Sequence, residues 1–176
     1  LDRATSGRIL LGDEDLGDAT DDRLSEIRAS RIGFVFQSYN LIPQLTVKRN
    51  IELPMQYLGW DTARSSERAR ELASKVGLEA RLEHRPTELS GGQMQRVAIA
   101  RALAGGPQII LADEPTGNLD THTADEVFKL FQRLVAQGKT LMIVTHDQQL
   151  SERMGRVIHL LDGRIERDQN NGNGNH

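Results

Sequence analysis

The sequence has no cysteine, no large excess of either charge and no long apolar run, and each absence excludes a class of protein. Without cysteine the chain cannot form disulfide bonds or thiolate zinc sites. Its 22 basic and 25 acidic residues give a net charge of -3, which does not indicate a nucleic-acid surface. Apolar runs such as residues 109–112 and 157–161 are far shorter than the roughly 20 residues that cross a bilayer. We therefore expect one domain with an ordinary hydrophobic core.

The second half of the chain has the pattern of a parallel sheet. Residues 109–112 and 141–144 are unbroken apolar runs, which are typical of parallel strands buried on both faces. Strand, helix and strand in this order imply a right-handed crossover, with Gly138 ending the helix. The helix is predicted from apolar residues at helical spacing, namely Ala124, Val127, Phe128, Phe131, Leu134 and Val135.

The first half combines strand and helix patterns. Residues 9–11 read as a strand of a hairpin, and residues 21–30 as a helix. Residues 32–36 form a β-branched and aromatic run, which suits a strand that delivers Gln37 to an edge of the sheet. Residues 46–85 are mostly helical in pattern and form a separate block.

The end of the chain is predicted to be a hairpin and a tail. Residues 157–161 and 164–165 flank Asp162 and Gly163, a turn pair that joins antiparallel strands. From Asp168 onward the residues are too polar to form a core, so we expect them to be disordered.

Two carboxylates follow the buried run of residues 109–112. Asp113 and Glu114 would lie at the carboxyl edge of the sheet, where ligands of open α/β sheets bind. Asp113 could hold Mg²⁺, often through water, and Glu114 could polarise an attacking water. Solvated charges are a common alternative at a strand end. That alternative is disfavoured because the next buried strand also ends in polar residues, among them His146, which can hydrogen-bond a terminal phosphate.

A second candidate site lies at the start of a predicted helix. Ser90, Gly91 and Gly92 would expose backbone N–H groups and the positive end of the helix dipole to an anion. A simple helix cap by Ser90 is the alternative, because serine often precedes a helix. Taken alone, the segment leaves both interpretations open.

The order of these segments resembles the ABC family of ATPases, over nearly all of residues 1–169. The resemblance implies an α/β fold, a P-loop NTPase (RecA-like) parallel-sheet core with an inserted helical subdomain and part of an antiparallel β region. It also implies roles for single residues. These are Gln37 in the Q-loop, Leu89, Ser90, Gly91, Gly92 and Gln93 in the signature motif, Asp113 as the Walker B aspartate, Glu114 as the catalytic glutamate, Gly117, Asn118, Leu119 and Asp120 around the D-loop, and His146 as the switch histidine.

The resemblance also divides the chain. Residues 1–36 would be the remnant of the N-terminal antiparallel β region and core, and residues 37–92 the Q-loop, helical subdomain and signature motif. Residues 93–169 would form the RecA-like core, and residues 170–176 a disordered tail.

The sequence departs from the family in one respect, because it contains no G-x-x-x-x-G-K-[ST] phosphate loop. Gly138, Lys139 and Thr140 mimic its end, but Arg133 occupies the position of the first glycine. A phosphate loop runs from a strand into a helix, whereas this segment runs from a helix into a strand and reads as a helix stop. We expect the true loop to precede Leu1.

In phosphate-loop folds, the strand that precedes the phosphate loop would lie between the strands of residues 109–112 and 141–144. Without that strand, the chain alone is expected to be partly molten or aggregated. Without the loop, it is expected to be inactive as an ATPase.

By resemblance, the protein is an ATP-hydrolysing subunit that uses ATP and Mg²⁺ and closes as a head-to-tail homodimer. Glu114 would act on water, Asp113 and Gln37 would serve the metal, and His146 would contact the γ-phosphate. Ser90, Gly91, Gly92, Gln93 and Asp120 would contribute to nucleotide binding.

Partners and location follow from the same resemblance. Residues 38–88 would dock on a transmembrane permease at the cytoplasmic face of the inner membrane, with no nucleic acid involved. Residues 34–43 and the form Gly117, Asn118, Leu119, Asp120 are similar to the bacterial lipoprotein-releasing and macrolide-efflux branch. An ABC ATPase of DNA repair or translation, and a non-catalytic signature-bearing subunit, are the alternatives. Long coiled coils, zinc cysteines or a tandem cassette would favour the former, and none occurs in the sequence.

Overall fold

The computed structural model describes residues 4–171 of the chain. At its centre is a sheet of three parallel strands. The sequence predicted all three, and their observed bounds differ from the expected ones by no more than one residue. In spatial order they are β3 (Ile32–Phe36), β4 (Ile109–Asp113) and β5 (Thr140–Val144).

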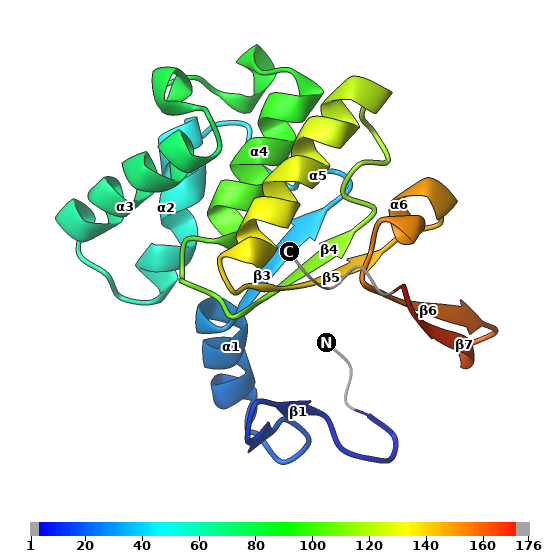
Figure 1. Ribbon diagram of the computed structural model, residues 1–176. Coiled ribbons are helices and arrows are strands. Elements are labelled where there is room, and N and C mark those ends of the chain that lie inside the picture. Colours follow the sequence, from blue (N-terminus) through cyan, green and yellow to red (C-terminus); the bar gives the residue numbers. More distant parts are fainter. Residues whose placement is uncertain (1–3, 172–176) are drawn as a thin grey trace.

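Helices cover one face of this sheet (Figure 1). One helix packs on β3 and another on β5, and a separate helical block lies beyond the first of them. The block follows β3 and precedes β4 in the chain, as expected for an inserted helical subdomain. The helices that cover this face are α4 (Gly91–Ala102) and α5 (Thr121–Ala136), and the block contains α2 (Val47–Tyr57), α3 (Thr62–Lys75), η1 (Glu79–Arg81) and η2 (Pro86–Glu88).

Short polar side chains determine where these helices begin. Thr46, Asp61, Ser90 and Asp120 precede α2, α3, α4 and α5, and each side chain accepts a hydrogen bond from a backbone N–H three residues later. Such caps satisfy N–H groups that have no partner within the helix. Gly77, with φ of 72°, follows the end of α3 and confirms the predicted helix stop.

The N-terminal part confirms the predicted hairpin and helix. β1 (Leu10–Leu11) and β2 (Glu14–Asp15) pair in antiparallel fashion, and α1 (Asp21–Ser30) follows them. The Glu14 carboxylate bonds the guanidinium of Arg31 at 2.8 Å, which ties the hairpin to the start of β3. In Figure 1 this part extends away from the helix-covered side of the sheet.

The C-terminal part begins with α6 (Gln148–Glu152) and ends in an antiparallel hairpin of β6 (Arg156–Leu161) and β7 (Arg164–Asn170). At its turn Asp162 and Gly163 both have positive φ, 47° and 74°. A type I′ turn requires this of its two central residues, so the predicted hairpin is confirmed with a physical reason for its turn.

The expectation of disorder from Asp168 onward is wrong for residues 168–170. They belong to β7, where Asp168 pairs with Arg156 through two bonds of 3.0 and 2.7 Å. Cross-strand pairing with β6 therefore outweighs their polarity. Residues 172–176, the larger part of the predicted tail, lie outside the described residues.

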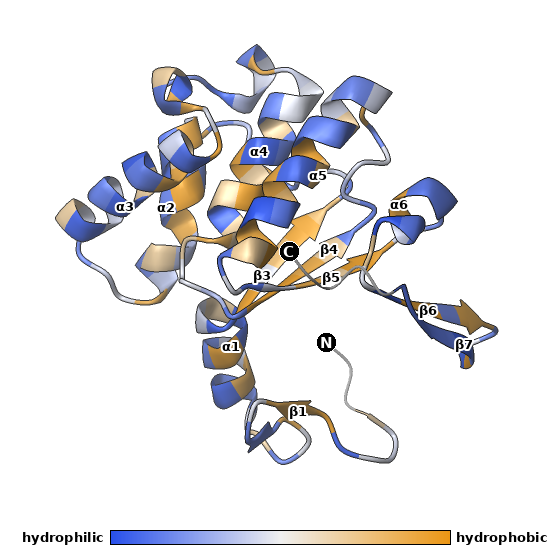
Figure 2. Ribbon diagram, in the orientation of Figure 1, coloured by the Kyte–Doolittle hydropathy of each residue, from blue (hydrophilic) through white to orange (hydrophobic). Residues whose placement is uncertain are grey.

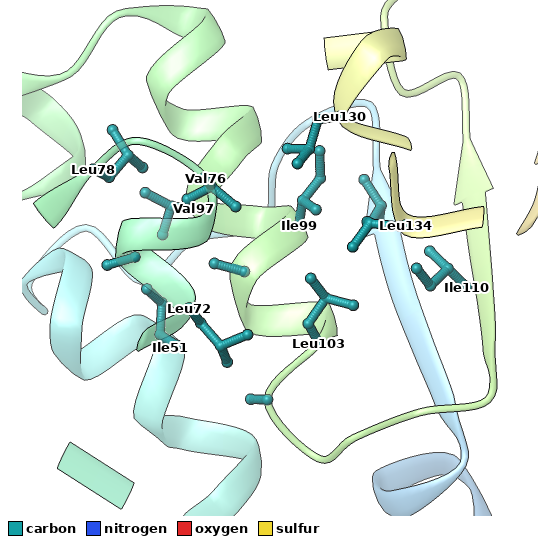
Figure 3. Close-up of a cluster of buried hydrophobic side chains, with 14 of the residues drawn as sticks. Ile51, Leu72, Val76, Leu78, Val97, Ile99, Leu103, Ile110, Leu130 and Leu134 are labelled. Carbon is teal, nitrogen blue, oxygen red and sulfur yellow. The ribbon is translucent and has the colours of Figure 1, made fainter. Parts of the chain in front are cut away.

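A single apolar core joins the helical block to the covered face of the sheet. Figure 3 shows side chains from α2, α3, α4, β4 and α5 converging there. Phe131 is the largest fully buried side chain. Labelled members of the cluster are Ile51, Leu72, Val76, Leu78, Val97, Ile99, Leu103, Ile110, Leu130 and Leu134.

Residues 109–112 and 141–144 were predicted to be buried on both faces. The prediction is wrong for β5 and only partly met for β4, where Ile109 and Leu111 on the second face are half-buried. On the helix side, Val35 and Ile110 are fully buried. On β5, Met142 is 56% exposed and Val144 is 62% exposed, because no helix among residues 4–171 packs on that face. In Figure 2 most of the length of these strands is hydrophobic, and their apolar residues occupy both faces of the sheet. Val135, one of the apolar residues from which α5 was predicted, is 47% exposed.

The expected position of the strand that precedes the phosphate loop, between β4 and β5, is also wrong. β4 and β5 pair directly over their whole length, from Ile109 beside Thr140 to Asp113 beside Val144. β4 and β5 are therefore hydrogen-bonded neighbours, and no strand lies between them.

Candidate functional site

The register of the sheet brings most of the predicted catalytic residues to one edge. Phe36 lies beside Asp113, and Asp113 beside Val144, so the strands end level with one another. Gln37, Glu114 and Thr145 follow directly in the chain, as expected from the parallel arrangement. This edge is the candidate functional site.

Glu114 forms the centre of a hydrogen-bonded cluster. Its Oε1 accepts from the backbone N–H of His146 at 2.9 Å and lies 2.6 Å from the ring Nδ1 of that residue. Its Oε2 accepts from the hydroxyl of Thr145 at 3.0 Å. The backbone of Glu114 has φ of 43°, a left-handed conformation that is strained for a residue with a side chain. The N–H of Glu114 donates to the carbonyl of Val144 at 2.9 Å and holds this turn against β5.

The same contacts keep Glu114 ionised. Burial by itself raises the pKa of the carboxyl group, but hydrogen bonds from His146 and Thr145 outweigh that effect, and the pKa lies below its ordinary value. The imidazole of His146 remains 86% exposed, so one side of the pair faces solvent. An ionised carboxylate beside an exposed imidazole can accept a proton from a bound water.

The side chain of Asp113 is exposed, and it makes no hydrogen bond or ion pair with any other residue that the structure describes. Its carboxylate and the carboxamide oxygen of Gln37 are ligands of the kind that Mg²⁺ prefers. Within residues 4–171 no three or more His, Cys, Asp and Glu side chains are grouped so that they could hold a metal ion. One carboxylate and one carboxamide oxygen suit Mg²⁺, because this ion usually keeps several of its water ligands.

Gly117 and Asn118 contact Gln37 at this edge. The side-chain amide of Asn118 donates to the backbone carbonyl of Gln37 at 3.1 Å, and Gln37 Nε2 lies 3.4 Å from Asn118 Oδ1. Asp120 caps α5 instead, because its carboxylate accepts from the N–H of Thr123 at 3.0 Å. Hydrogen bonds with the side chain and the backbone of Thr123 lower the pKa of Asp120.

The predicted signature segment forms a capped helix start. The hydroxyl of Ser90 accepts from the N–H of Gln93 at 3.3 Å, and the Gln93 side chain accepts from the N–H of Ser90 at 3.0 Å. This reciprocal arrangement is a capping box, so the simple-cap interpretation describes the geometry of the isolated chain. A Cβ on Gly92 would lie 2.3 Å from the Thr123 side chain, which explains the glycine by packing against α5.

No hydrogen bond described here joins this segment directly to Glu114 or His146, but α4 itself is bonded to the candidate site. Gln95 is fully buried, and its amide donates to the carbonyl of Pro115 at 2.6 Å. Sequence reasoning missed Gln95, because a glutamine in an amphipathic helix carries no local sign of a distant partner.

Arg101 is a second residue that the sequence did not reveal. Its guanidinium donates to the carbonyls of Tyr39, at 2.9 Å, and of Asn40. Both of these residues have positive φ, 59° and 49°. Burial lowers the pKa of Arg101. The sequence contains no sign of this contact, because the residue types of Tyr39 and Asn40 do not reveal their left-handed backbone conformation.

Asn50 supports the next part of the same loop. It is fully buried, accepts from the N–H of Ile42 at 2.8 Å, and donates to the carbonyls of Ile42, Leu45 and Thr46 at 3.0 to 3.1 Å. Two side chains from different helices, Asn50 and Arg101, therefore fix the backbone that follows Gln37.

The segment that mimics a phosphate loop is a helix stop, as predicted. Gly138, with φ of 85°, follows α5, and Lys139 extends to the carbonyl of Pro107 at 2.6 Å. The lysine therefore bonds backbone and does not lie at the candidate site.

No helix within residues 4–171 is both long enough and apolar enough to cross a membrane.

A family model described as ABC transporter matches residues 1–117. The lipoprotein-releasing system ATP-binding protein LolD of Syntrophotalea carbinolica is 48% identical over 166 residues, 94% of this chain and 73% of that protein. The macrolide export ATP-binding/permease protein MacB of Shigella flexneri is 47% identical over 168 residues, 96% of this chain and 26% of that protein.

Among solved structures, the chain resembles a dimeric post-hydrolysis state of the ATP-binding cassette MJ0796 bound to ADP and Pi. The TM-score is 0.85 at 42% identity, over 97% of this chain and 75% of that one. The expected fold, a RecA-like parallel sheet with an inserted helical subdomain and antiparallel strands, is confirmed by this similarity.

Proposed function

Because the chain belongs to the ABC transporter family of ATP-binding proteins, we propose that it carries the hydrolytic and dimer-forming surfaces of a transport ATPase. The proposed activity is ATP hydrolysis coupled to substrate export or lipoprotein release across a membrane. The observation that carries the proposal is the Glu114 cluster, in which an ionised carboxylate, an exposed imidazole and a threonine hydroxyl meet at the carboxyl edge of the sheet.

Each residue of the edge has a proposed task. Glu114 orients the attacking water and accepts its proton, since its lowered pKa keeps it ionised at neutral pH. His146 bonds the γ-phosphate through the exposed side of its ring. Asp113 and Gln37 hold Mg²⁺, which when bound offsets negative charge on the phosphates.

The signature segment is proposed to act on a second copy of the chain. Ser90 and Gly92 lie at the N-terminus of α4, where backbone N–H groups and the helix dipole favour an anion. Gly91 and Gln93 complete this surface, and Asp120 lies at the start of the adjacent helix α5. In a head-to-tail homodimer these residues would contact the nucleotide held mainly by the partner. A dimeric relative bound to ADP and Pi supports this arrangement.

Residues 38–88 are proposed to dock on a transmembrane permease at the cytoplasmic face of the inner membrane. An open hollow of about 340 Å³ lies in this region, between the loop after Gln37 and the start of α4. Tyr39, Leu41, Pro43 and Leu89 are among its lining residues, and their apolar surface suits a partner's apolar side chain. The name of MacB, which joins ATP-binding and permease functions, supports such a partner.

Hydrolysis is tested by comparing two proteins. The 176 residues contain no phosphate loop, so we expect the chain alone to show no metal-dependent ATP turnover. Joining a phosphate-loop segment of a relative in front of Leu1 should give turnover, and Glu114→Gln in that fusion should lower kcat by about 10²- to 10⁴-fold, the usual range for a general base. Wild-type turnover in the Glu114→Gln fusion would remove Glu114 from its proposed role.

The dimer interface is tested in the same fusion. Ser90→Arg should prevent ATP-dependent dimerisation by placing bulk and charge against the partner's nucleotide, whereas Glu114→Gln should prolong the dimer. Light scattering with and without ATP distinguishes the two variants. Normal ATP-dependent dimerisation of Ser90→Arg would contradict the proposed interface.

A further inference from the structure

Gln37 and Asn118 form a reciprocal pair across 81 residues of sequence. One contact runs from the Asn118 side-chain amide to the Gln37 backbone carbonyl at 3.1 Å, and the other from Gln37 Nε2 to Asn118 Oδ1 at 3.4 Å. Each residue follows or lies near the end of a strand of the parallel sheet. The pair therefore links the loop after β3 to the loop after β4.

The chemistry of the first contact decides the orientation of both side chains. A backbone carbonyl can only accept a hydrogen bond, so Asn118 must present its nitrogen to it. Asn118 Oδ1 is then the atom left for the side chain of Gln37, which must present its own nitrogen in return. Gln37 Oε1 is consequently turned away from Asn118, and it accepts no hydrogen bond from any residue that the structure describes.

We propose that Asn118 is a positioning residue that fixes the carboxamide of Gln37 with its oxygen directed away from the loop and available to a divalent cation or a water. The inference rests on the proposed function, in which Gln37 serves the metal. The orientation matters because a flipped carboxamide presents N–H donors where a cation requires an oxygen ligand.

Gly117 provides independent evidence that this loop shapes the position of Gln37. A Cβ on Gly117 would lie 2.7 Å from Gln37 Nε2 and 3.4 Å from its Cδ. The backbone of Gly117 does not have positive φ, so space and not conformation accounts for the glycine. Gly117 makes room for the amide, and Asn118 determines which of its two ends turns outward.

The test uses NMR of the ¹⁵N-labelled phosphate-loop fusion described above, with Gln37→Glu identifying the side-chain amide signal of Gln37. In Asn118→Leu, which has similar volume and no hydrogen-bonding groups, we expect the Gln37 amide protons to exchange with water roughly fivefold faster, as expected on loss of one modest hydrogen bond. Gly117→Ala should shift the same signal because its methyl group displaces the amide. Thr121→Val, an exposed change at the start of α5, is the control and should leave the signal unchanged.

Folding and function are separated in this design. Gly117 and Asn118 are both exposed, so thermal unfolding should differ little among the variants. If Asn118→Leu fails to fold, Gly117→Ala provides the test, since its nearest clash is with the end of a flexible side chain. Unchanged exchange and position of the Gln37 signal in the folded variants would overturn the proposal.

A second readout uses Mn²⁺ alone, with its affinity followed by the relaxation of water protons. Asn118→Leu and Gly117→Ala should bind Mn²⁺ severalfold more weakly than the wild type and Thr121→Val. Equal affinity in all four chains would overturn the proposed role toward the metal. Neither readout involves hydrolysis, so failure here leaves the proposed ATPase function standing, and an inactive fusion leaves the orientation of Gln37 standing.

Discussion

The two faces of the parallel sheet differ in what covers them, although the strands carry apolar residues on both faces. On one face, Val35, Ile110 and Ala112 pack under helices and are at most 2% exposed. On the other, Met142 and Val144 are more than half exposed. A parallel sheet with apolar residues on both faces is stable when both are covered. The chain thus combines a complete core on one side with an apolar surface on the other, and stability and solubility depend on different residues.

The largest expected effect lies on the covered side. Phe131→Ala removes the largest fully buried side chain and should lower the free energy of unfolding by about 3–5 kcal/mol, through lost apolar transfer and a cavity. Urea unfolding followed by circular dichroism measures it. Val135→Ala on the same helix is the matched control and should change stability by about 0.5 kcal/mol or less, because Val135 is 47% exposed. Similar losses in both variants would contradict the placement of Phe131 in the core.

Substitutions on the uncovered face of the sheet should change stability less but should change solubility clearly. Met142→Ser combined with Val144→Thr should leave the free energy of unfolding within roughly 0.5 kcal/mol per change, because both residues are exposed. The wild-type chain should bind a hydrophobic dye and scatter light, and the double variant should do both less. A wild-type sample that is monodisperse and binds no dye would show that this face is not an aggregation surface.

The smallest expected effect concerns the contribution of Glu114, at the carboxyl edge of the sheet, to the free energy of unfolding. The pKa of Glu114 is below its ordinary value, so its stabilising contribution is fully present above the unfolded-state value of about 4.3 and is lost as the pH falls through the lower folded-state value. Urea unfolding of the wild type and Glu114→Gln should therefore differ at pH 7 and converge as the pH falls below about 4. A difference that does not depend on pH would exclude this linkage.

The sequence predicted the parts of the fold that depend on local rules. α1 and β3 have the predicted bounds, because a capping threonine, Thr20, precedes the helix and a β-branched run forms the strand. The grouping of Asp113, Glu114, Gln37 and His146 followed from strand ends alone. Their geometry confirms that they share an edge, while their catalytic roles stay predictions.

What the sequence missed depends on contacts between distant segments. The exposure of Met142 follows from which helices pack where, and periodicity cannot distinguish a covered apolar face from a bare one. The clamp of Arg101 on Tyr39 spans 62 residues, and the left-handed backbone of Glu114 arises from its turn against β5. The prediction of disorder for residues 168–170 failed for a similar reason, because pairing with β6, and not their polarity, decides their structure.

The attachments of α4 give it a mechanical property. It is about 18 Å long at 1.5 Å per residue, with Ser90 at its exposed end. Gln95 fastens its middle to the turn beyond Glu114, and Arg101 fastens its far end to the strained loop beyond Gln37. If α4 moved as a rigid rod, the points at which it is attached to both loops would move with it.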